Sequence, residues 1–499
     1  MRFIAAIARL IARIPAYAHA LDMLSAAHLP WVPDVSIPSS GPPMISSVLL
    51  LSFAVVHSVA QSAHAAAPPP TLPNPAAVRE VTLGKRVDAS AAWWGFDPAD
   101  STAALQAAFD SKAKRVLIPY MGKPWIVRPL QLRGNQEIDL APGVVILAKR
   151  GEYQSVQDSV FTATDASNLT IRGYGATIRM WKHDYQNPPY KKGEWRMGVS
   201  LRGVRHVLIE GLRVESSGGD GFYIDGSKTH LWSQDVTLRD CIADDNHRQG
   251  ISVISAVGLL VDNCVFSNTS GTAPQAGIDL EPDAPNQRLQ NIVIRNSIFE
   301  NNAGSGMDVY LKQFNGTSAP VSILFDHCLS RMSDGVIGSS GISVGAVRDE
   351  GPKGVVEFRD TTVDSAGMSD VTVAAKSADG AQLRFVRCHF NHPWTTPHPE
   401  YTGPRVPILI VLRQPKVTHH LGGISFTESF VYDTENRPAI QVYEGCVKYS
   451  VKGWWCDPDE TNYGAYRLHG HLFVENPTGV HADLDNPTDS DLQITAPPQ

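Results

Sequence analysis

Three successive stretches share one pattern: DVTLRDCIADDNHRQGISV (235–253), LLVDNCVFSNTSGTAPQAGIDL (259–280) and NIVIRNSIFENNAGSGMDV (291–309). Each begins with alternating apolar and polar residues, passes through an Asp or Asn turn, and ends in an apolar strand that follows a glycine. Alternation with a period of two is typical of strands, and Asn, Asp and Gly are typical of turns. Repetition of this unit predicts a solenoid built from short strands.

Related copies run from about Asn168 to about Val442, and the residue after the turn aligns in each of them. The spacing varies, because the step from Cys241 to Cys264 is 23 residues and the step from Cys264 to Ser297 is 33. A variable period is expected of a parallel β-helix, in which strands stack at a fixed spacing while loops absorb insertions. The aligned positions are Leu212, Cys241, Cys264, Ser297, Cys328, Thr361 and Cys388.

Four of the six cysteines lie in this aligned column, where a small apolar thiol packs well inside a solenoid. Disulfides between neighbouring rungs would distort the backbone, so we expect these four thiols to be free and buried. Cys446 and Cys456 lie outside the column and are candidates for a disulfide. No CxxC or HxxxH spacing occurs, and no transition-metal site is predicted.

An amphipathic helix is predicted just before the repeats, in residues 100–109, with Asp100 as a candidate N-cap and apolar residues at 105, 108 and 109. A short helix at this place would cap the open end of the solenoid and protect its strand edges. The segments WGFDPADSTAALQAAFDS (94–111), VLIP (116–119) and GNQEIDLAPGVVI (134–146) resemble the N-terminal part of pectin-lyase-like right-handed β-helix proteins.

That resemblance covers most of the chain after about Val81, and it implies an all-β, right-handed parallel β-helix with a short N-terminal capping helix. The superfamily holds polysaccharide lyases, glycoside hydrolases, alginate epimerases and phage tailspikes, so it also implies a carbohydrate substrate. It does not define the reaction, because one fold hosts many chemistries.

The ends of the chain differ in composition from the repeats. Residues 1–65 end in an apolar run followed by Ala63-His64-Ala65, which indicates a signal peptide whose true start is uncertain and a secreted or periplasmic protein without a membrane span. Residues 66–80 are expected to form a Pro-rich linker, and residues 81–445 the β-helix. Residues 446–499 are expected to be a loop-rich segment that packs on or caps the solenoid. The oligomeric state stays open.

Charge excludes one class of partner. The chain has 43 Lys and Arg against 50 Asp and Glu, with a formal net charge of −7, and it lacks a long basic run. A nucleic-acid binder is expected to carry a basic patch, so nucleic acid is not a predicted partner.

Acidic residues collect on the outward face of the strands that follow the aligned glycines. Counting from those glycines places Asp279 and Asp308 side by side on neighbouring rungs, roughly 4.8 Å apart and facing solvent. Asp225 and Glu281 lie two rungs apart in the next outward column. Like charges held this close raise the pKa of one group, and a protonated carboxyl beside an ionised one is what glycoside hydrolysis requires.

The predicted catalytic residues are therefore Asp279, Glu281, Asp308 and Asp225, with His247 in support from the adjoining turn. The predicted substrate contacts are Arg248, Asp220, Tyr223, Asp283 and Tyr310. Each carboxylate alone would more often be a solvated surface group, and His247 and Arg248 could equally hold the turn through local ion pairs.

Three functions remain open at this point. The favoured one is a glycoside hydrolase that needs no cofactor. The second is a lyase or C5-epimerase acting on a uronate polymer, in which Arg248 or His247 abstracts the proton and the acids bind Ca²⁺ or the substrate. The third is a non-catalytic glycan-binding β-helix.

Overall fold

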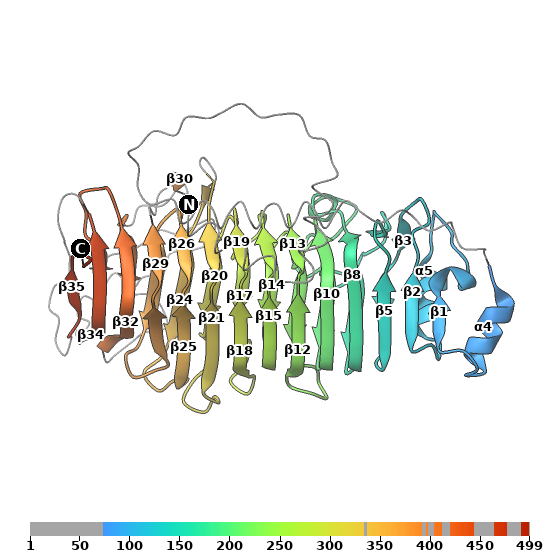
Figure 1. The fold of residues 1–499 in the computed structure, drawn as a ribbon, viewed down its shortest axis with the longest axis horizontal. Coiled ribbons are helices and arrows are strands. Elements are labelled where there is room, and N and C mark those ends of the chain that lie inside the picture. Colours follow the sequence, from blue (N-terminus) through green and yellow to red (C-terminus); the bar gives the residue numbers. More distant parts are fainter. Residues whose placement is uncertain are drawn as a thin grey trace, which may run out of the picture. The chain divides into compact units, whose positions relative to one another are not determined.

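The repeated units wind into a parallel β-helix, in which each strand pairs with the equivalent strands of the preceding and following rungs (Figure 1). The computed structural model describes residues 73–333, 337–391, 396–397, 404–411, 420–443, 464–476 and 491–498. The predicted signal peptide and the candidate disulfide of Cys446 and Cys456 lie outside these residues.

One sheet contains the strands that follow the aligned glycines, and we call it the site sheet. Its strands are β4 (Leu130–Gln131), β7 (Phe161–Thr164), β9 (Val199–Arg202), β11 (Phe222–Asp225), β14 (Gln249–Val253), β17 (Ala276–Leu280), β20 (Met307–Tyr310), β24 (Ile342–Val347), β27 (Val371–Lys376), β31 (Ile408–Val411) and β33 (Ile440–Tyr443).

The other two faces of the solenoid join into one large sheet, because four long strands bend across both of them. Those four strands are β8 (Ser167–Arg179), β10 (Arg205–Glu215), β32 (His420–Tyr432) and β34 (Gly464–Glu475). The second face adds β1 (Asp88–Ser90), β2 (Arg115–Ile118), β5 (Gln136–Leu140), β12 (Ser233–Arg239), β15 (Ala256–Asp262), β18 (Leu289–Arg295), β21 (Val321–Asp326), β25 (Gly354–Arg359) and β28 (Gln382–Val386). The third face adds β3 (Trp125–Val127), β6 (Val145–Ala148), β13 (Ile242–Asp244), β16 (Val265–Ser267), β19 (Ile298–Glu300), β22 (Leu329–Arg331), β26 (Thr362–Asp364), β29 (His389–Asn391) and β35 (Gln493–Thr495). A separate pair, β23 (Ile337–Gly338) and β30 (Thr396–Pro397), also runs parallel.

The aligned column is buried inside the solenoid, as predicted. Pairing of Ile242 with Val265 and of Val265 with Ile298 places Cys241, Cys264 and Ser297 on successive rungs. These three residues are at most 1% exposed, and the four cysteines of the column are free. Phenylalanines stack in a neighbouring column, with ring centroids 4.7 Å apart between Phe325 and Phe358 and 5.4 Å apart between Phe358 and Phe385. Side chains that repeat at one position therefore pack on themselves from rung to rung.

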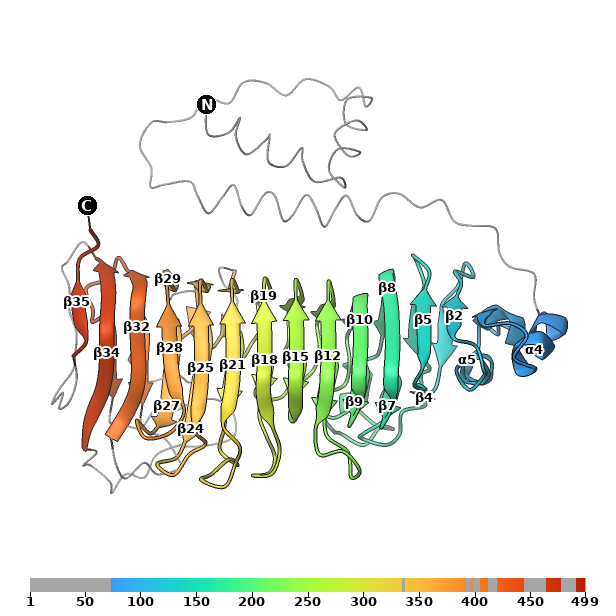
Figure 2. The ribbon, with the colours of Figure 1, turned by 60° about the horizontal axis from the view of Figure 1, so that its bottom comes forward.

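Helices cover the N-terminal end of the solenoid (Figure 2). The predicted capping helix is α5 (Thr102–Phe109), which buries Leu105, Ala108 and Phe109. Its N-cap residue is Ser101, while the carboxylate of Asp100 accepts a hydrogen bond from the backbone of Thr102. Two short 3-10 helices are η1 (Ala91–Trp94) and η2 (Asp184–Gln186).

The ends of the solenoid differ from the predicted boundaries. Residues 75–80, expected in the Pro-rich linker, belong to the helix α4 (Pro75–Thr82), because Asn74 caps the first turn and Val81 packs into the core. The β-helix also continues beyond residue 445, since β34 pairs with β32 and β35 pairs with β34. In the part of the chain that the structure describes, no helix has the length and apolar character needed to cross a bilayer.

Candidate active site

The outward column of the site sheet has the predicted register. Tyr223 pairs with Ser252, Ser252 with Asp279, and Asp279 with Asp308 on consecutive strands β11, β14, β17 and β20. The inward residues that alternate with them are buried, as period-two alternation requires. Asp279 and Asp308 are therefore neighbours across one rung.

Asp279 faces outward but does not face solvent, which corrects the sequence-based expectation. The side chain is 1% exposed, and Gln249 of the preceding rung donates a hydrogen bond of 2.7 Å to one carboxylate oxygen. Gln249 is itself fixed because its amide oxygen accepts from the backbone of Ala276. Burial, reinforced by the charges of Glu281 and Asp308, raises the pKa of Asp279 well above its usual range. The surroundings of Asp279 thus favour its neutral, protonated form.

Arg248 brings two carboxylates together. Its guanidinium lies 3.8 Å from the Asp220 carboxylate and 3.6 Å from that of Glu281, and its side chain is 14% exposed. Burial disfavours the charged form of Arg248, but the charges of Asp220, Asp279 and Glu281 outweigh this effect and raise its pKa. We refer to Asp220, Asp279, Glu281 and Arg248 as the acid cluster.

Asp220 is more deeply buried than a turn residue needs to be. It has no exposed surface, and among the described residues neither carboxylate oxygen has a partner of good hydrogen-bond geometry. Burial raises its pKa to about 6, although the charge of Arg248 opposes the rise. The turn is held by its backbone, because the Gly219 carbonyl accepts from the backbone amide groups of His247 and Arg248.

The more exposed side chains of this face lie at the rim of the acid cluster. The Glu281 side chain is 32% exposed, and burial raises its pKa against the opposing charge of Arg248. Asp308 and Tyr310 are half-buried on the next rung. Asp283 is exposed, yet partial burial raises its pKa while Arg248 and Arg202 act against the rise.

His247 lies apart from these carboxylates, contrary to the predicted supporting role. Its ring packs against Gly271, at a distance where an added Cβ would clash with it. Burial and the charge of Lys182 lower its pKa to about 4, so the ring is neutral at pH 7. Glu194 is the carboxylate that acts most strongly on it. The ring therefore belongs to the packing of the turn.

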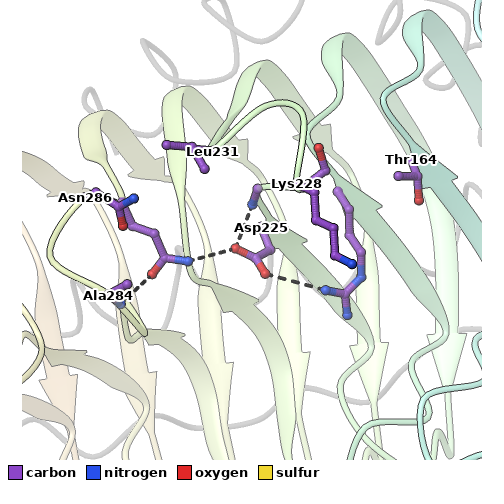
Figure 3. A pocket seen from close by; sticks show the side chains of 10 residues that line it. Thr164, Asp225, Lys228, Leu231, Ala284 and Asn286 are labelled. Carbon is purple, nitrogen blue, oxygen red and sulfur yellow. Dashed lines mark hydrogen bonds and ion pairs between the residues drawn. The ribbon is translucent and has the colours of Figure 1, made fainter.

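Asp225 and Tyr223 lie outside the acid cluster. The Asp225 carboxylate accepts hydrogen bonds from the Tyr223 hydroxyl at 3.0 Å and from Gln287 at 3.2 Å, and it lies 3.5 Å from the Arg202 guanidinium. Tyr223 is 7% exposed, and Arg202 lies over its ring at 4.5 Å from the centroid. Asp225, Arg202 and Gln287 line a pocket, seen from close by in Figure 3.

Three residues that sequence reasoning missed complete this face: Gln249, Arg202 and Gln287. A signal existed for two of them, because Arg202 pairs directly with Asp225 and Gln249 occupies the position of Asp220 one rung later. Extending the outward columns by one rung would have found both. Gln287 carried no such signal, since it comes from a loop.

Calcium does not fit the acid cluster. A calcium ion needs six to eight oxygen ligands around one point, whereas here the Arg248 guanidinium supplies the positive charge between Asp220 and Glu281. Within the described ranges, one group has metal-ligating atoms close together, namely Asp326, His327 and Asp360. Its Asp360 already forms an ion pair of 2.7 Å with Arg387, so this group is a surface network at the turns.

Comparison with known proteins shows which proteins this chain resembles. Residues 167–344 match the family model of the right-handed β-helix region. The prophage-derived uncharacterized protein YorA of Bacillus subtilis is 28% identical over 261 residues, which are 49% of this chain and 42% of YorA. The uncharacterized protein YclG of Bacillus subtilis is 28% identical over 37% of this chain and 32% of its own length. The chain thus matches less than half the length of either relative.

Two solved structures share the fold. The A-module of the mannuronan C-5 epimerase AlgE6 of Azotobacter vinelandii covers 83% of this chain and all of its own length, with 17% identity and a TM-score of 0.55. The A-module of AlgE4 from the same organism covers 82% of this chain and 98% of its own, with 16% identity and a TM-score of 0.51. With the parallel rungs, the buried column and the capping helix, these matches show that the chain has the right-handed parallel β-helix fold.

Proposed function

We propose that this protein is a carbohydrate-active enzyme that hydrolyses glycosidic bonds, with Glu281 as general acid and Asp308 as general base. The observation that carries the proposal is the pairing of Asp279 with Asp308 on adjacent rungs, two residues from Glu281. Glu281 is accessible and its pKa is raised, which suits a group that must hold a proton and deliver it to a leaving oxygen. Asp308 is half-buried beside it and suits the second carboxylate.

Asp279 and Arg248 act as positioning residues in this proposal. Asp279 is too buried to reach a substrate, but its neutral form, which burial favours, limits its repulsion of the neighbouring carboxylates Glu281 and Asp308. Arg248 holds the Glu281 carboxylate in place from 3.6 Å. Asp220, behind Arg248, fixes the guanidinium on its far side.

The spacing of the pair favours inversion of configuration. Glu281 lies one rung and about two residues along the strand from the position of Asp308, which separates their backbones by roughly 8 Å. Because both side chains leave the same face of the sheet, we expect a similar separation between their carboxyl groups. Inverting hydrolases keep their carboxyl groups ~6.5–9.5 Å apart, which leaves room for a water molecule between base and sugar. We expect the first-formed product to have the inverted anomeric configuration, as measured by proton NMR of a freshly cleaved oligosaccharide.

The mutational test compares wild type with Glu281→Gln and Asp308→Asn on a panel of polysaccharides. We expect each substitution to lower the rate of glycosidic cleavage by about 10²–10⁴-fold, because each removes one proton-transfer group. New reducing ends report the rate, and product mass reports the addition of water. Asp88→Asn is the matched control, since Asp88 is an exposed carboxylate in β1 at the capped end. Unchanged cleavage in both variants would show that the assignment of the site is wrong.

A lyase or epimerase acting on a uronate is the second candidate, and one observation favours it. The Arg248 guanidinium is buried beside the acids, and its Nε lacks a hydrogen-bond partner among the residues described. A substrate carboxylate is a natural partner for such a group. The two solved relatives of similar fold are named for action on mannuronan, which suits a polysaccharide substrate of this kind. The raised pKa of Arg248 argues against its acting as the base.

Two further measurements in the same assay distinguish the hydrolase from a lyase or an epimerase. Elimination gives an unsaturated uronate with ultraviolet absorbance and no added water, and epimerisation in D₂O gives deuterium at C5 without chain cleavage. If wild type binds a glycan but leaves it unchanged by every reading, the protein is a glycan-binding β-helix.

A further inference from the structure

A pocket of about 540 Å³ lies at one edge of the site sheet, outside the acid cluster. Two loops form it: residues 226–231 after β11, and residues 284–287, which follow β17 by a few residues. In Figure 3, Lys228 and Asn286 lie on opposite sides of Asp225. Neither the acid cluster nor the proposed chemistry uses this pocket.

The charge of the pocket is positive. Its lining contains two cations, Arg202 and Lys228, and one carboxylate, Asp225. Lys228 is exposed and forms no ion pair with any residue in the described ranges. The amide of Asn286 adds a polar group that suits sugar hydroxyls, whereas the Ser227 hydroxyl is already bonded to Asp165 and to the backbone of Thr229.

Asp225 anchors the pocket and offsets one of its two positive charges, which leaves an excess of one. Its oxygens already accept from Tyr223, from the backbone of Gly226 and from Gln287. The Arg202 guanidinium lies 3.5 Å from the Asp225 carboxylate, and one of its faces lies over the ring of Tyr223. A guanidinium fixed on one side can still bind an anion with its remaining donors.

The pocket and Glu281, the proposed general acid, share one outward column, whereas Asp308 lies in the neighbouring column of Asp279. Arg202 pairs with Asp225 on the next rung. The backbone amide of Ile254 donates to the Ile224 carbonyl, which places Ile254 one rung further, and the amide of Glu281 donates to the Val253 carbonyl in the same way. Arg202 and Glu281 are therefore three rungs apart. Three rungs span roughly 14 Å, which a short oligosaccharide can bridge along the solenoid axis. The charges of both Arg202 and Arg248 act on the exposed carboxylate of Asp283.

We propose that this pocket is a subsite for an anionic sugar, whose carboxylate or sulfate group binds between Arg202 and Lys228. The proposal rests on the proposed function in assuming a glycan ligand, and it names the substrate class as an acidic glycan. The anionic sugar lies a few units along the chain from the bond at Glu281, so it contributes to binding and register without touching the reacting atoms.

The test measures binding without turnover, in the full-length Glu281→Gln protein. The probes are hexamers of galacturonate and of mannuronate, a sulfated galactan hexamer, and methyl-esterified hexagalacturonate as the neutral match. We expect at least one charged hexamer to bind roughly tenfold more tightly than the neutral one, as for one charge-assisted contact. The carboxylate and sulfate probes identify which anion the pocket selects.

Substitutions locate the binding. Lys228→Gln should remove most of the preference for the charged hexamer and make its binding less sensitive to salt. Lys228→Arg should restore that preference. Arg202→Gln should act in the same direction as Lys228→Gln, while Lys114→Gln, an exposed lysine far along the chain, should change nothing. Loss of folding in Arg202→Gln leaves the Lys228 pair as the deciding measurement.

The outcomes are distinct from those of the hydrolase proposal. Equal binding of charged and neutral hexamers, binding unaffected by Lys228→Gln, or no binding of any charged probe overturns the anionic subsite. Charged hexamers that bind through Lys228 but are never cleaved by wild type uphold the subsite and contradict the hydrolase.

Discussion

At the scale of single residues, two carboxyl groups of the acid cluster are buried. Asp220 and Asp279 are both at most 1% exposed, and each has an oxygen without a hydrogen-bond partner among the described residues. A buried carboxylate is costly unless it is paired or protonated. Arg248 supplies the partial pairing, and the raised pKa values of these acids reflect the remaining cost. Such perturbed groups collect at functional sites more often than elsewhere.

The Asp220 carboxyl should make stability depend on pH. Its pKa rises from 3.8 to about 6 on folding, so between these values the native state binds more protons than the unfolded state. Stability therefore falls as pH rises from about 4 to about 6, by about 3 kcal/mol for this one group. Asp220→Asn should flatten the profile of unfolding midpoint against pH in that window, while Asp88→Asn should retain it. An unchanged slope in Asp220→Asn would mean that Asp220 titrates normally.

At the scale of elements, stability comes from contacts between neighbouring rungs. The stacked rings of Phe325, Phe358, Phe385 and Phe426 illustrate this, because each ring packs on the equivalent ring above and below. Solenoids behave as nearest-neighbour systems, in which each repeat is stabilised by the two beside it. A substitution in one rung therefore acts mainly on that rung and the next.

Removal of one ring tests this. Phe358→Ala leaves a cavity between two stacked rings and should cost about 3–5 kcal/mol. Hydrogen exchange should then increase most in β21, β25 and β28, the strands that carry Phe325, Phe358 and Phe385. Val355→Ala is the control, since Val355 is a half-buried residue of the same strand β25. Exchange that increases equally along all rungs would contradict nearest-neighbour stabilisation.

At the scale of the whole molecule, the sequence predicts an exported enzyme whose site lies on one sheet of a solenoid. A parallel β-helix is well suited to a linear glycan, because its outward columns place functional groups at a regular spacing along one axis. Glu281 and Arg202 of the proposed anionic subsite occupy rungs of the same column. The predicted signal for export lies in residues 1–65, outside the described residues.

Export is a prediction that protein chemistry can check. The small-x-small sequence Ala63-His64-Ala65 predicts a mature chain that begins at Ala66. Mass spectrometry of protein recovered from the periplasm or the medium should find that N-terminus, and Ala63→Arg should block processing. Full-length chain confined to the cytoplasm would contradict the prediction.

The sequence alone determined the fold, the register of the site sheet and the free buried cysteines, because alternation and turn residues are local signals that repeat in every rung. It missed helix α4, although Asn74 and Pro75 form a recognisable helix start, because the Pro-rich composition around them pointed to a linker. Only the tertiary structure decided that Asp279 is buried, that Arg248 joins Asp220 to Glu281, and that His247 turns away. Alternation defines which face of a strand a side chain leaves from, whereas its burial, charge and partners depend on loops and rungs that are distant in sequence and meet only in the folded chain.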